Sequence, residues 1–312
     1  MSRRTPRLLA ATLAVAALTL GACAEKTSND TPAAGASSAA ATFPVTVGKL
    51  TLEKRPEKIV SLSPSATEML FAIGAGKQVT AVDDQSNYPA DAPKSDLSGF
   101  QPNAEAIAGK SPDLVVLSND TNKIVAQLTT LKIPVLLTPA ATTLDDSYQQ
   151  ITDLGTLTGH PAEAADVTKR MKDDIAKLTK DLPQRAKKLT YYHELGPELY
   201  SATSKTFIGS IYALAGLENI ADASDADGKN LGYPQLSQEV IVKANPDFVF
   251  LADTKCCKVT PAAVKARSGW AGVSAVKNNQ VVALDDDIAS RWGPRVVDQL
   301  RTIVDAVAKV PA

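Results

Sequence analysis

The order of apolar and polar residues predicts short strands that alternate with helices from residue 58 onward. The strand-like runs are apolar and rich in β-branched residues, whereas the helical stretches repeat apolar residues every three or four positions. The predicted strands are Lys58–Leu62, Val79–Val82, Leu114–Leu117, Val135–Leu137, Leu189–His193, Phe248–Leu251 and Val281–Leu284. The predicted helices are Ser65–Ile73, Thr121–Leu131, Leu144–Thr158, Phe207–Leu214, Ser237–Lys243 and Gly293–Val310. Such alternation is typical of parallel βα units with helices on both sheet faces.

The longest helical signal lies near the middle of the chain, at Pro161–Leu182. It opens with proline in its first turn and contains no glycine. Its apolar positions form a single stripe, made of Val167, Met171, Ile175 and Leu178. Two interpretations are open. The helix either links two lobes or is one more surface helix of the first lobe.

An internal repeat favours two lobes. The segments 103–117 and 237–251 align at one fixed offset, and each reads as a short helix, a Pro-Asp turn and a buried strand. Glu105 then matches Glu239, and Asp113 matches Asp247. A generic helix–turn–strand unit can mimic part of this pattern, but it explains the matched glutamates less well. We therefore predict two copies of one α/β lobe.

The N-terminus has the features of an export signal. Arg3, Arg4 and Arg7 precede the apolar stretch Leu8–Leu20, which is short for a membrane span. Small residues then precede Cys23, as in the lipobox of bacterial lipoproteins. We predict a lipoprotein signal peptide at 1–22 and lipidation of Cys23, with an ordinary secretory signal as the alternative. The pattern leaves the Sec and twin-arginine export routes open.

Composition sets the remaining divisions of the chain. Residues 23–42 are small and polar and predict a disordered tether. The rest of the 312 residues is enough for two lobes, at 43–160 and 184–312, joined by a linking helix at 161–183. The net charge of −1 gives no basic excess for nucleic acid, and we expect a monomer. Cys256 and Cys257 are adjacent, which leaves a vicinal disulfide, two free thiols or a soft-metal site open.

Three segments in order, Lys58–Glu68, Asn87–Pro89 and Tyr233–Glu239, resemble the ABC-transporter periplasmic-binding proteins for vitamin B12 and ferric siderophores. The resemblance extends from Lys58 to the C-terminus. It implies two Rossmann-like lobes joined by one long helix, with ligand in the cleft between them. It also implies delivery to a permease dimer that is driven by cytoplasmic ATPase subunits, from the outer face of the membrane.

The resemblance also implies roles for individual residues. Glu105 and Glu239 match the glutamates that dock on arginines of the permease, although each could be an ordinary carboxylate near a helix start. The expected ligand contacts are Ser63, Gln85, Tyr88, Phe100, Tyr233, Arg291, Trp292 and Arg295. Three of them match aromatics of the B12-binding protein, whereas Gln85 replaces a fourth. Arg295 could instead pair with a structural carboxylate, and Trp292 could belong to the core.

The expected ligand is cobalamin or a ferric siderophore, with cobalamin favoured by the aromatic positions. A metal-ion or heme receptor of the same superfamily is the nearest alternative, and the chain has only two histidines, His160 and His193, to serve it. An exported hydrolase is the alternative from another class, but neither a G-x-S-x-G nor an H-E-x-x-H motif occurs. We therefore expect a binding protein with no catalytic residues, no cofactor and no bound metal.

Overall fold

The computed structural model describes residues 42–311, and all seven predicted apolar runs form paired strands. The first sheet has the order β4-β3-β5-β6, and all its pairings are parallel. Its strands are β3 (Ile59–Leu62), β4 (Val79–Val82), β5 (Leu114–Leu117) and β6 (Val135–Leu137). The predicted signal peptide at 1–22, Cys23 and the tether as far as residue 41 lie outside the described residues.

The second sheet repeats the topology of the first. It has the order β10-β9-β7-β8, again with parallel pairings only. Its strands are β7 (Thr190–Glu194), β8 (Glu218–Asn219), β9 (Phe248–Leu251) and β10 (Val281–Ala283). In both sheets the first strand along the chain lies between the second and the third, and the fourth borders the third. The predicted fold class, two α/β lobes with parallel sheets, is confirmed.

The two copies of the internal repeat have the same local structure. Each begins with a short helix, α2 (Ala104–Ala108) or α7 (Gln238–Ala244), and ends in β5 or β9. Asp113 accepts hydrogen bonds from the backbone N–H groups of Glu57 and Lys58, at 2.9 and 3.0 Å, just before β3 begins. Asp247 accepts one from the N–H of Thr190, at 2.8 Å, where β7 begins. The repeated aspartate therefore fastens the first strand of each sheet.

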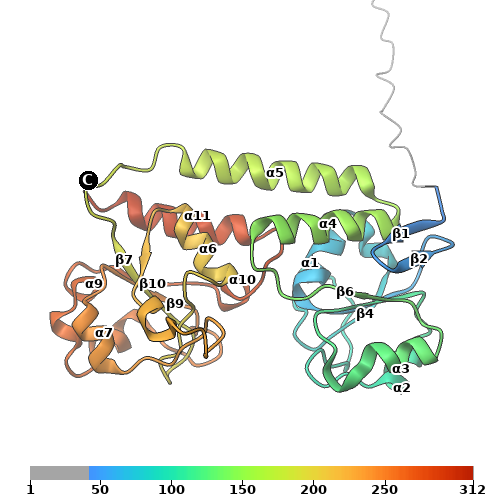
Figure 1. Ribbon diagram of the computed structural model, residues 1–312, viewed down its shortest axis with the longest axis horizontal. Helices are drawn as coiled ribbons and strands as arrows, with labels where there is room; N and C mark the ends of the chain where they lie inside the picture. Colours follow the sequence, from blue (N-terminus) through green and yellow to red (C-terminus); the bar gives the residue numbers. More distant parts are fainter. Residues whose placement is uncertain (1–41, 312) are drawn as a thin grey trace, which may run out of the picture. The chain divides into compact units, whose positions relative to one another are not determined.

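Helix α5 (Pro161–Thr179) is the predicted linking helix. It packs against α4 (Leu144–Thr158), which follows the first sheet, and against α11 (Val296–Ala308), which follows the second (Figure 1). Val167, Met171 and Ile175 of its predicted stripe are buried. The helix ends three residues before the predicted Leu182. Pro183 explains this difference, because a residue before proline disfavours the helical conformation.

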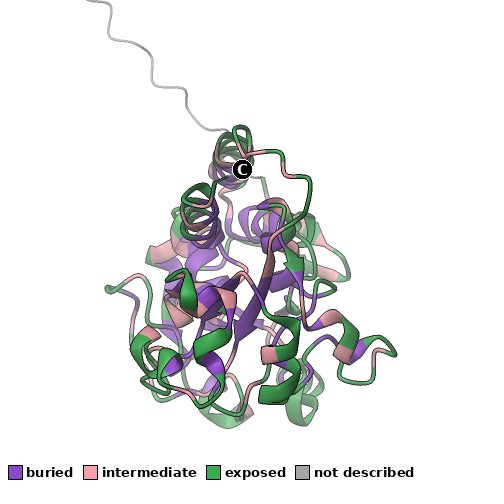
Figure 2. Ribbon diagram, turned by 90° about the vertical axis from the view of Figure 1, so that its left-hand side faces the viewer, coloured by how far each residue is buried: buried purple, intermediate pink, exposed green. Residues whose placement is uncertain are grey.

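Apolar side chains cover both faces of each sheet, and one cluster extends across both sheets. Figure 2 shows buried residues along the strands and on the inner sides of the helices. Alternate residues of β5 and β9, such as Val116 and Phe250, join one cluster that also contains Met171 of α5 and Leu300 of α11. The opposite faces belong to two separate clusters, one in each lobe. Because of the shared cluster, the proposed lobe boundaries at 160 and 184 remain predictions.

Several short elements complete the described chain. The remaining helices are α1 (Pro64–Ala72), α3 (Ile124–Thr130), α6 (Phe207–Leu214), α8 (Pro261–Lys265), α9 (Ser274–Lys277) and α10 (Asp286–Ala289). The 3₁₀ turns are Ala75–Gln78, Thr121–Lys123, Asp222–Asp225 and Trp270–Gly272. An antiparallel hairpin, β1 (Val45–Val47) and β2 (Leu50–Leu52), precedes the first sheet and was not predicted. Among the helices of residues 42–311, none combines the length and the apolar character that crossing a bilayer requires.

Candidate ligand and docking sites

The loops that follow the first and third strands of each sheet are the natural place for a ligand. In this topology the connections from those two strands leave on opposite sides of the sheet and open a crevice at the carboxyl edge. In the first sheet these strands are β3 and β5, and in the second they are β7 and β9. Ser63 follows β3 directly, but its side chain is buried and its hydroxyl accepts a hydrogen bond from the Ala66 N–H at 3.3 Å. Ser63 therefore acts as the N-cap of α1.

Three of the predicted ligand residues are large side chains that the fold leaves in water. Tyr88 is 45% exposed, Phe100 is 72% exposed and Tyr233 is 44% exposed. Tyr88 lies in the loop after β4, Phe100 shortly before α2, and Tyr233 shortly before α7. An exposed aromatic thus precedes the repeated helix in each lobe. Burying these rings against a flat apolar partner would remove a large unfavourable contact with water.

Two further exposed apolar residues were missed by the sequence analysis. Leu231 is 85% exposed, and Tyr200 is 45% exposed. Leu231 is two residues from Tyr233, and Tyr200 pairs through a β-bridge with Gln235 in the same segment. Their sequence context gave no signal, because a single leucine or tyrosine in a loop is usually packed. The second lobe therefore offers a wider apolar surface around Tyr233 than predicted.

Glu68 of α1 forms a buried ionic cluster with two arginines of the second half of the chain, which we call the inter-lobe clamp. Its carboxylate accepts hydrogen bonds from Arg291 Nη1 at 2.9 Å and from Arg295 Nε and Nη2 at 2.9 and 2.5 Å. The Glu68 side chain is 1% exposed, and those of Arg291 and Arg295 are 8% and 18% exposed. Burial lowers the pKa of Arg295, but hydrogen bonds and the charge of Glu68 outweigh it, so the pKa is raised.

The residues around the clamp hold the same segment in place. The second terminal nitrogen of Arg291 donates to the carbonyl oxygen of Gln85 at 3.0 Å. The guanidinium carbon of Arg295 lies 4.1 Å from the ring centroid of Tyr88. The Trp292 indole N–H donates to Gln150 of α4 at 2.8 Å. Arg291, Trp292 and Arg295 are thus held by groups of the protein itself, and their expected contacts with a ligand stay predictions. Arg295 follows the alternative of pairing with a structural carboxylate.

Gln85 lies three residues before Tyr88 and is exposed. Its backbone oxygen accepts from Arg291, and within residues 42–311 its side chain forms no hydrogen bond. Asn87, two residues on, donates from its side chain to Asp287 Oδ2 at 3.1 Å. The loop that carries Gln85 and Tyr88 thereby has two hydrogen bonds to the second lobe, in addition to the contact of Tyr88 with Arg295. This fixes the position of the Tyr88 ring relative to the clamp.

Glu105 and Glu239 occupy the same place on matching helices. Each is the second residue of its helix. In α2 the side chain of the N-cap residue Asn103 accepts a hydrogen bond from the Ala106 N–H at 2.9 Å. In α7 the side chain of the N-cap residue Ser237 accepts one from the Val240 N–H at 3.2 Å. Both glutamates are exposed, and neither forms an ion pair within the described part of the chain. Figure 1 shows α2 and α7 on the side of their sheets away from α5. The two carboxylates are therefore available to an external partner.

Neither histidine is placed to bind a metal or a heme iron. His193 is fully buried, and its Nδ1 lies 2.8 Å from the hydroxyl of Tyr212. Burial lowers the pKa of His193 to about 3, so the ring stays neutral. His160 Nε2 lies 2.7 Å from Arg55 Nη2 and 3.1 Å from Gln78 Oε1. The pKa of His160 is lowered by burial and by the charge of Arg55.

A buried acidic pair lies at the carboxyl edge of the second sheet. Glu194, the last residue of β7, receives two hydrogen bonds of 2.6 Å from Arg267. Asp253, two residues after β9, is fully buried, and neither of its carboxyl oxygens has a hydrogen-bond partner among the described residues. Burial, followed by the negative charge of Glu194, raises the pKa of Asp253 to about 7. Arg267 can neutralise only one of these two acids, so Asp253 keeps a proton in acid solution.

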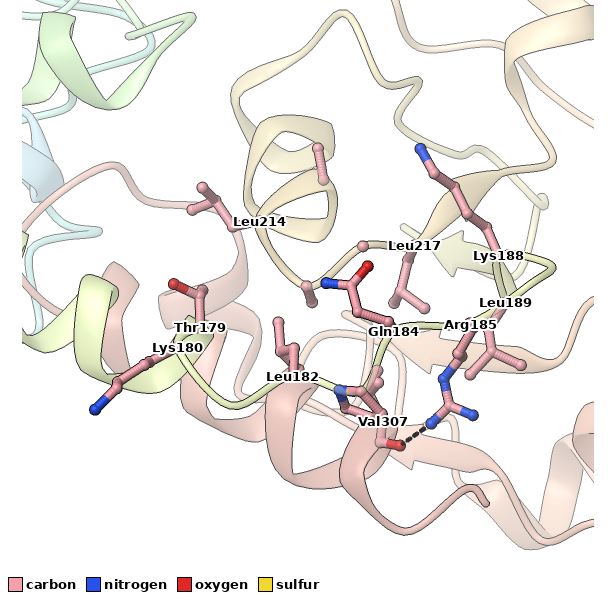
Figure 3. A pocket seen from close by; sticks show the side chains of 14 residues that line it. Thr179, Lys180, Leu182, Gln184, Arg185, Lys188, Leu189, Leu214, Leu217 and Val307 are labelled. Atoms are coloured by element: carbon pink, nitrogen blue, oxygen red, sulfur yellow. Dashed lines mark hydrogen bonds between the residues drawn. The ribbon is translucent and has the colours of Figure 1, made fainter. Parts of the chain in front are cut away.

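A cavity of about 310 Å³ lies elsewhere, where the segment after α5 meets the ends of α6 and α11 (Figure 3). Leu182, Leu214 and Leu217 contribute apolar walls, and Arg185 reaches the last turn of α11, where it donates to the carbonyl oxygen of Val307 at 3.2 Å. None of the predicted ligand residues lines this cavity. Arg185 serves there as a cap for carbonyl groups at the end of α11.

Comparison with known proteins places this geometry in a family. Residues 59–288 match the family described as periplasmic binding protein. A cobalamin-binding protein of Halobacterium salinarum is 34% identical over 281 residues, which cover 86% of this chain and 75% of that protein. An uncharacterized ABC transporter substrate-binding lipoprotein of Bacillus subtilis, YvrC, is 30% identical over 283 residues, covering 85% of this chain and 86% of that protein.

A solved structure agrees with both relatives. The periplasmic vitamin B12 binding protein BtuF of Vibrio cholerae is 26% identical and superposes with a TM-score of 0.66, covering 82% of this chain and 99% of that one. These proteins are named for binding a solute and not for a reaction. The chain therefore belongs to the periplasmic binding protein family and is a solute-binding component of an ABC transporter, not an enzyme.

Proposed function

We propose that this protein is a lipid-anchored receptor on the outer face of the cell membrane that binds cobalamin and delivers it to an ABC permease. The observation that carries the proposal is the set of exposed aromatics, Tyr88, Phe100 and Tyr233, on loops of two lobes with the same topology. Flat rings suit the face of a large macrocycle. Relatives named for binding cobalamin or vitamin B12 support the same ligand. Gln85 and Leu231 extend this surface.

The metal of the ligand keeps its own coordination in this proposal. His193 is fully buried, and His160 Nε2 contacts Arg55 and Gln78, so neither imidazole is offered to cobalt or iron. A corrinoid or a ferric siderophore already satisfies its metal and needs only surface contacts and hydrogen bonds. A heme with an open axial position would need a tyrosine oxygen instead. A ferric siderophore is therefore the second candidate, and heme is the third.

Isothermal titration calorimetry tests the ligand. Cyanocobalamin, a ferric hydroxamate siderophore and hemin are titrated in turn into the purified protein. We expect one-to-one binding of cyanocobalamin. Replacing Tyr88 or Tyr233 by alanine should weaken it about tenfold or more, the effect of losing a central aromatic contact. Leu131→Ala is the matched control, because Leu131 is an exposed apolar residue that directly follows α3, away from the aromatic loops. If hemin or the siderophore binds and cyanocobalamin does not, the proposal that cobalamin is the ligand is wrong.

Glu105 and Glu239 are proposed to dock on arginines of the permease dimer. Two equal carboxylates on lobes of equal topology suit a partner with two-fold symmetry, and carboxylate–arginine pairs fix orientation. The double variant Glu105→Lys, Glu239→Lys should lose transport in cells while its calorimetric ligand affinity stays unchanged. Asp145→Lys is the matched control, since Asp145 is an exposed acid at the second position of α4. Equal loss of transport in the control, or lost ligand affinity in the double variant, would reject docking.

The anchor is proposed from Cys23 and residues 1–22. Metabolic labelling with a fatty acid tests it. We expect label on the wild-type protein and none on Cys23→Ala, which should appear in the soluble fraction. Labelling that persists in the variant would reject Cys23 as the site of lipidation.

A further inference from the structure

Cys256 and Cys257 form a disulfide between neighbouring residues on an exposed loop of the second lobe. The loop follows β9, and both cysteines are exposed. A disulfide stabilises a protein mainly by closing a long loop in the unfolded chain. This one joins adjacent residues and closes almost no chain, so it contributes little to global stability. Stabilisation of the fold therefore does not explain this disulfide, and another role has to be sought.

One carboxylate accepts hydrogen bonds from the backbone next to the disulfide. Asp286, the first residue of α10, accepts hydrogen bonds from the N–H groups of Thr254 and Lys255, both at 2.8 Å, and of Cys256 at 3.0 Å. Burial raises the pKa of Asp286, but these hydrogen bonds outweigh it and the pKa is lowered. The loop is thus held as far as Cys256. Beyond the disulfide, the one hydrogen bond of Cys257 to another described residue is from its backbone N–H to the carbonyl oxygen of Asp253, at 3.2 Å.

The same loop is connected to the first lobe through a side chain next to the disulfide. Lys255 Nζ lies 2.7 Å from Asp285 Oδ1 and 2.7 Å from Asp287 Oδ2. Asp287 in turn accepts from the side chain of Asn87 at 3.1 Å, and Asn87 immediately precedes Tyr88. Two consecutive side-chain contacts, Lys255 with Asp287 and Asp287 with Asn87, therefore connect the neighbour of Cys256 to the neighbour of Tyr88.

We propose that Cys256–Cys257 is a site of thiol–disulfide exchange with small-molecule thiols, and that opening it weakens ligand binding. The thiolate of the small molecule attacks one Sγ, the S–S bond breaks, and the other cysteine leaves as a thiolate that takes up a proton. A second small-molecule thiolate then attacks the mixed disulfide, which releases the first cysteine and the oxidised small molecule. Exposure allows this attack, and exposed disulfides are the labile ones. The ligand effect rests on the proposed function, whereas the exchange does not.

The exchange is tested on the full chain without ligand. The protein is treated with reduced glutathione, alkylated with N-ethylmaleimide under native conditions and digested, so that mass spectrometry reads the peptide with both cysteines separately from Cys23. We expect no label on this peptide before reduction and two labels after it, with an unchanged melting temperature. Amide hydrogen exchange at 254–259 should become faster. Label before reduction, or reduction that succeeds only in denaturant, would overturn the site.

The coupling is tested by calorimetry with cyanocobalamin. We expect reduction to weaken binding about fivefold, the lower end of ordinary coupling between sites. The double variant Cys256→Ser, Cys257→Ser should bind like the reduced protein and should not respond to glutathione. Equal affinity of the oxidised and reduced forms would overturn the coupling. If cyanocobalamin does not bind to either form, the proposed function fails, whereas the labelling result still decides the exchange site.

Discussion

Removing the charge of Glu68 should weaken the whole protein, because the inter-lobe clamp contains one acid and two arginines. Glu68→Gln keeps the size of the side chain but leaves Arg291 and Arg295, 8% and 18% exposed, without their shared carboxylate. Breaking a buried ion pair from one side costs about 3–5 kcal/mol. Arg291 keeps Asp287 at 3.1 Å, and Arg295 keeps the face of Tyr88. We therefore expect the lower end, about 3 kcal/mol in the free energy of unfolding.

Urea denaturation followed by circular dichroism measures this change from the shift of the midpoint at constant slope. Asp173→Asn is the control, since the pair of Lys169 and Asp173 lies on the surface of α5 and its loss should not shift the midpoint measurably. A double-mutant cycle with Arg295→Gln isolates the direct contact and should give a coupling of about 1 kcal/mol or more. A loss below about 1 kcal/mol for Glu68→Gln would refute the view that these charges depend on one another.

Three other predictions concern the buried Asp253, the buried His193 and the repeated aspartates Asp113 and Asp247. Because the pKa of Asp253 is raised to about 7, the folded state keeps a proton that the unfolded chain releases near pH 4. The free energy of unfolding should therefore fall as pH rises from about 4 to 7, by at most about 1.4 kcal/mol per pH unit. Melting curves of Asp253→Asn should lack this fall. His193 has the opposite sign, since its folded pKa of about 3 makes stability fall as pH drops below 6.5, and His193→Gln should flatten that acid limb. Asp113→Ala and Asp247→Ala should each cost about 1–3 kcal/mol in urea denaturation, and clearly unequal costs would contradict their equivalent roles.

The fold was largely predictable because its strands are short apolar runs and its helices have regular apolar spacing. The strands β4, β5, β6 and β9 have the predicted bounds, and so do α4 and α6. β8 was missed because two residues, Glu218 and Asn219, carry no periodicity. The hairpin β1–β2 was missed although valine or leucine alternates with threonine on both sides of Gly48, which takes a positive φ of 56°. That pattern is a usable hairpin signal.

The site was less predictable than the fold, because contacts between distant residues leave no local pattern. Glu68 and Arg295 are separated by 227 positions, so the sequence could not say whether Arg295 meets a ligand or a carboxylate. One signal was present, since Glu68 is a charged residue within the apolar helix Ser65–Ile73 and a buried acid needs a partner. The exposed aromatics could be named only through the resemblance, because their sequence context does not separate a ring in water from one in the core.

The apolar cluster that runs through Val116, Met171, Phe250 and Leu300 makes the two halves of the protein dependent on each other. Cutting the chain at residue 160 would remove α5 from the first half and expose a large apolar surface on both fragments. Calorimetric melting of the intact protein should accordingly give a single peak instead of one for each half. Any relative movement of the halves must then be a small bend that leaves the shared apolar cluster buried, and not a large rotation about a flexible linker.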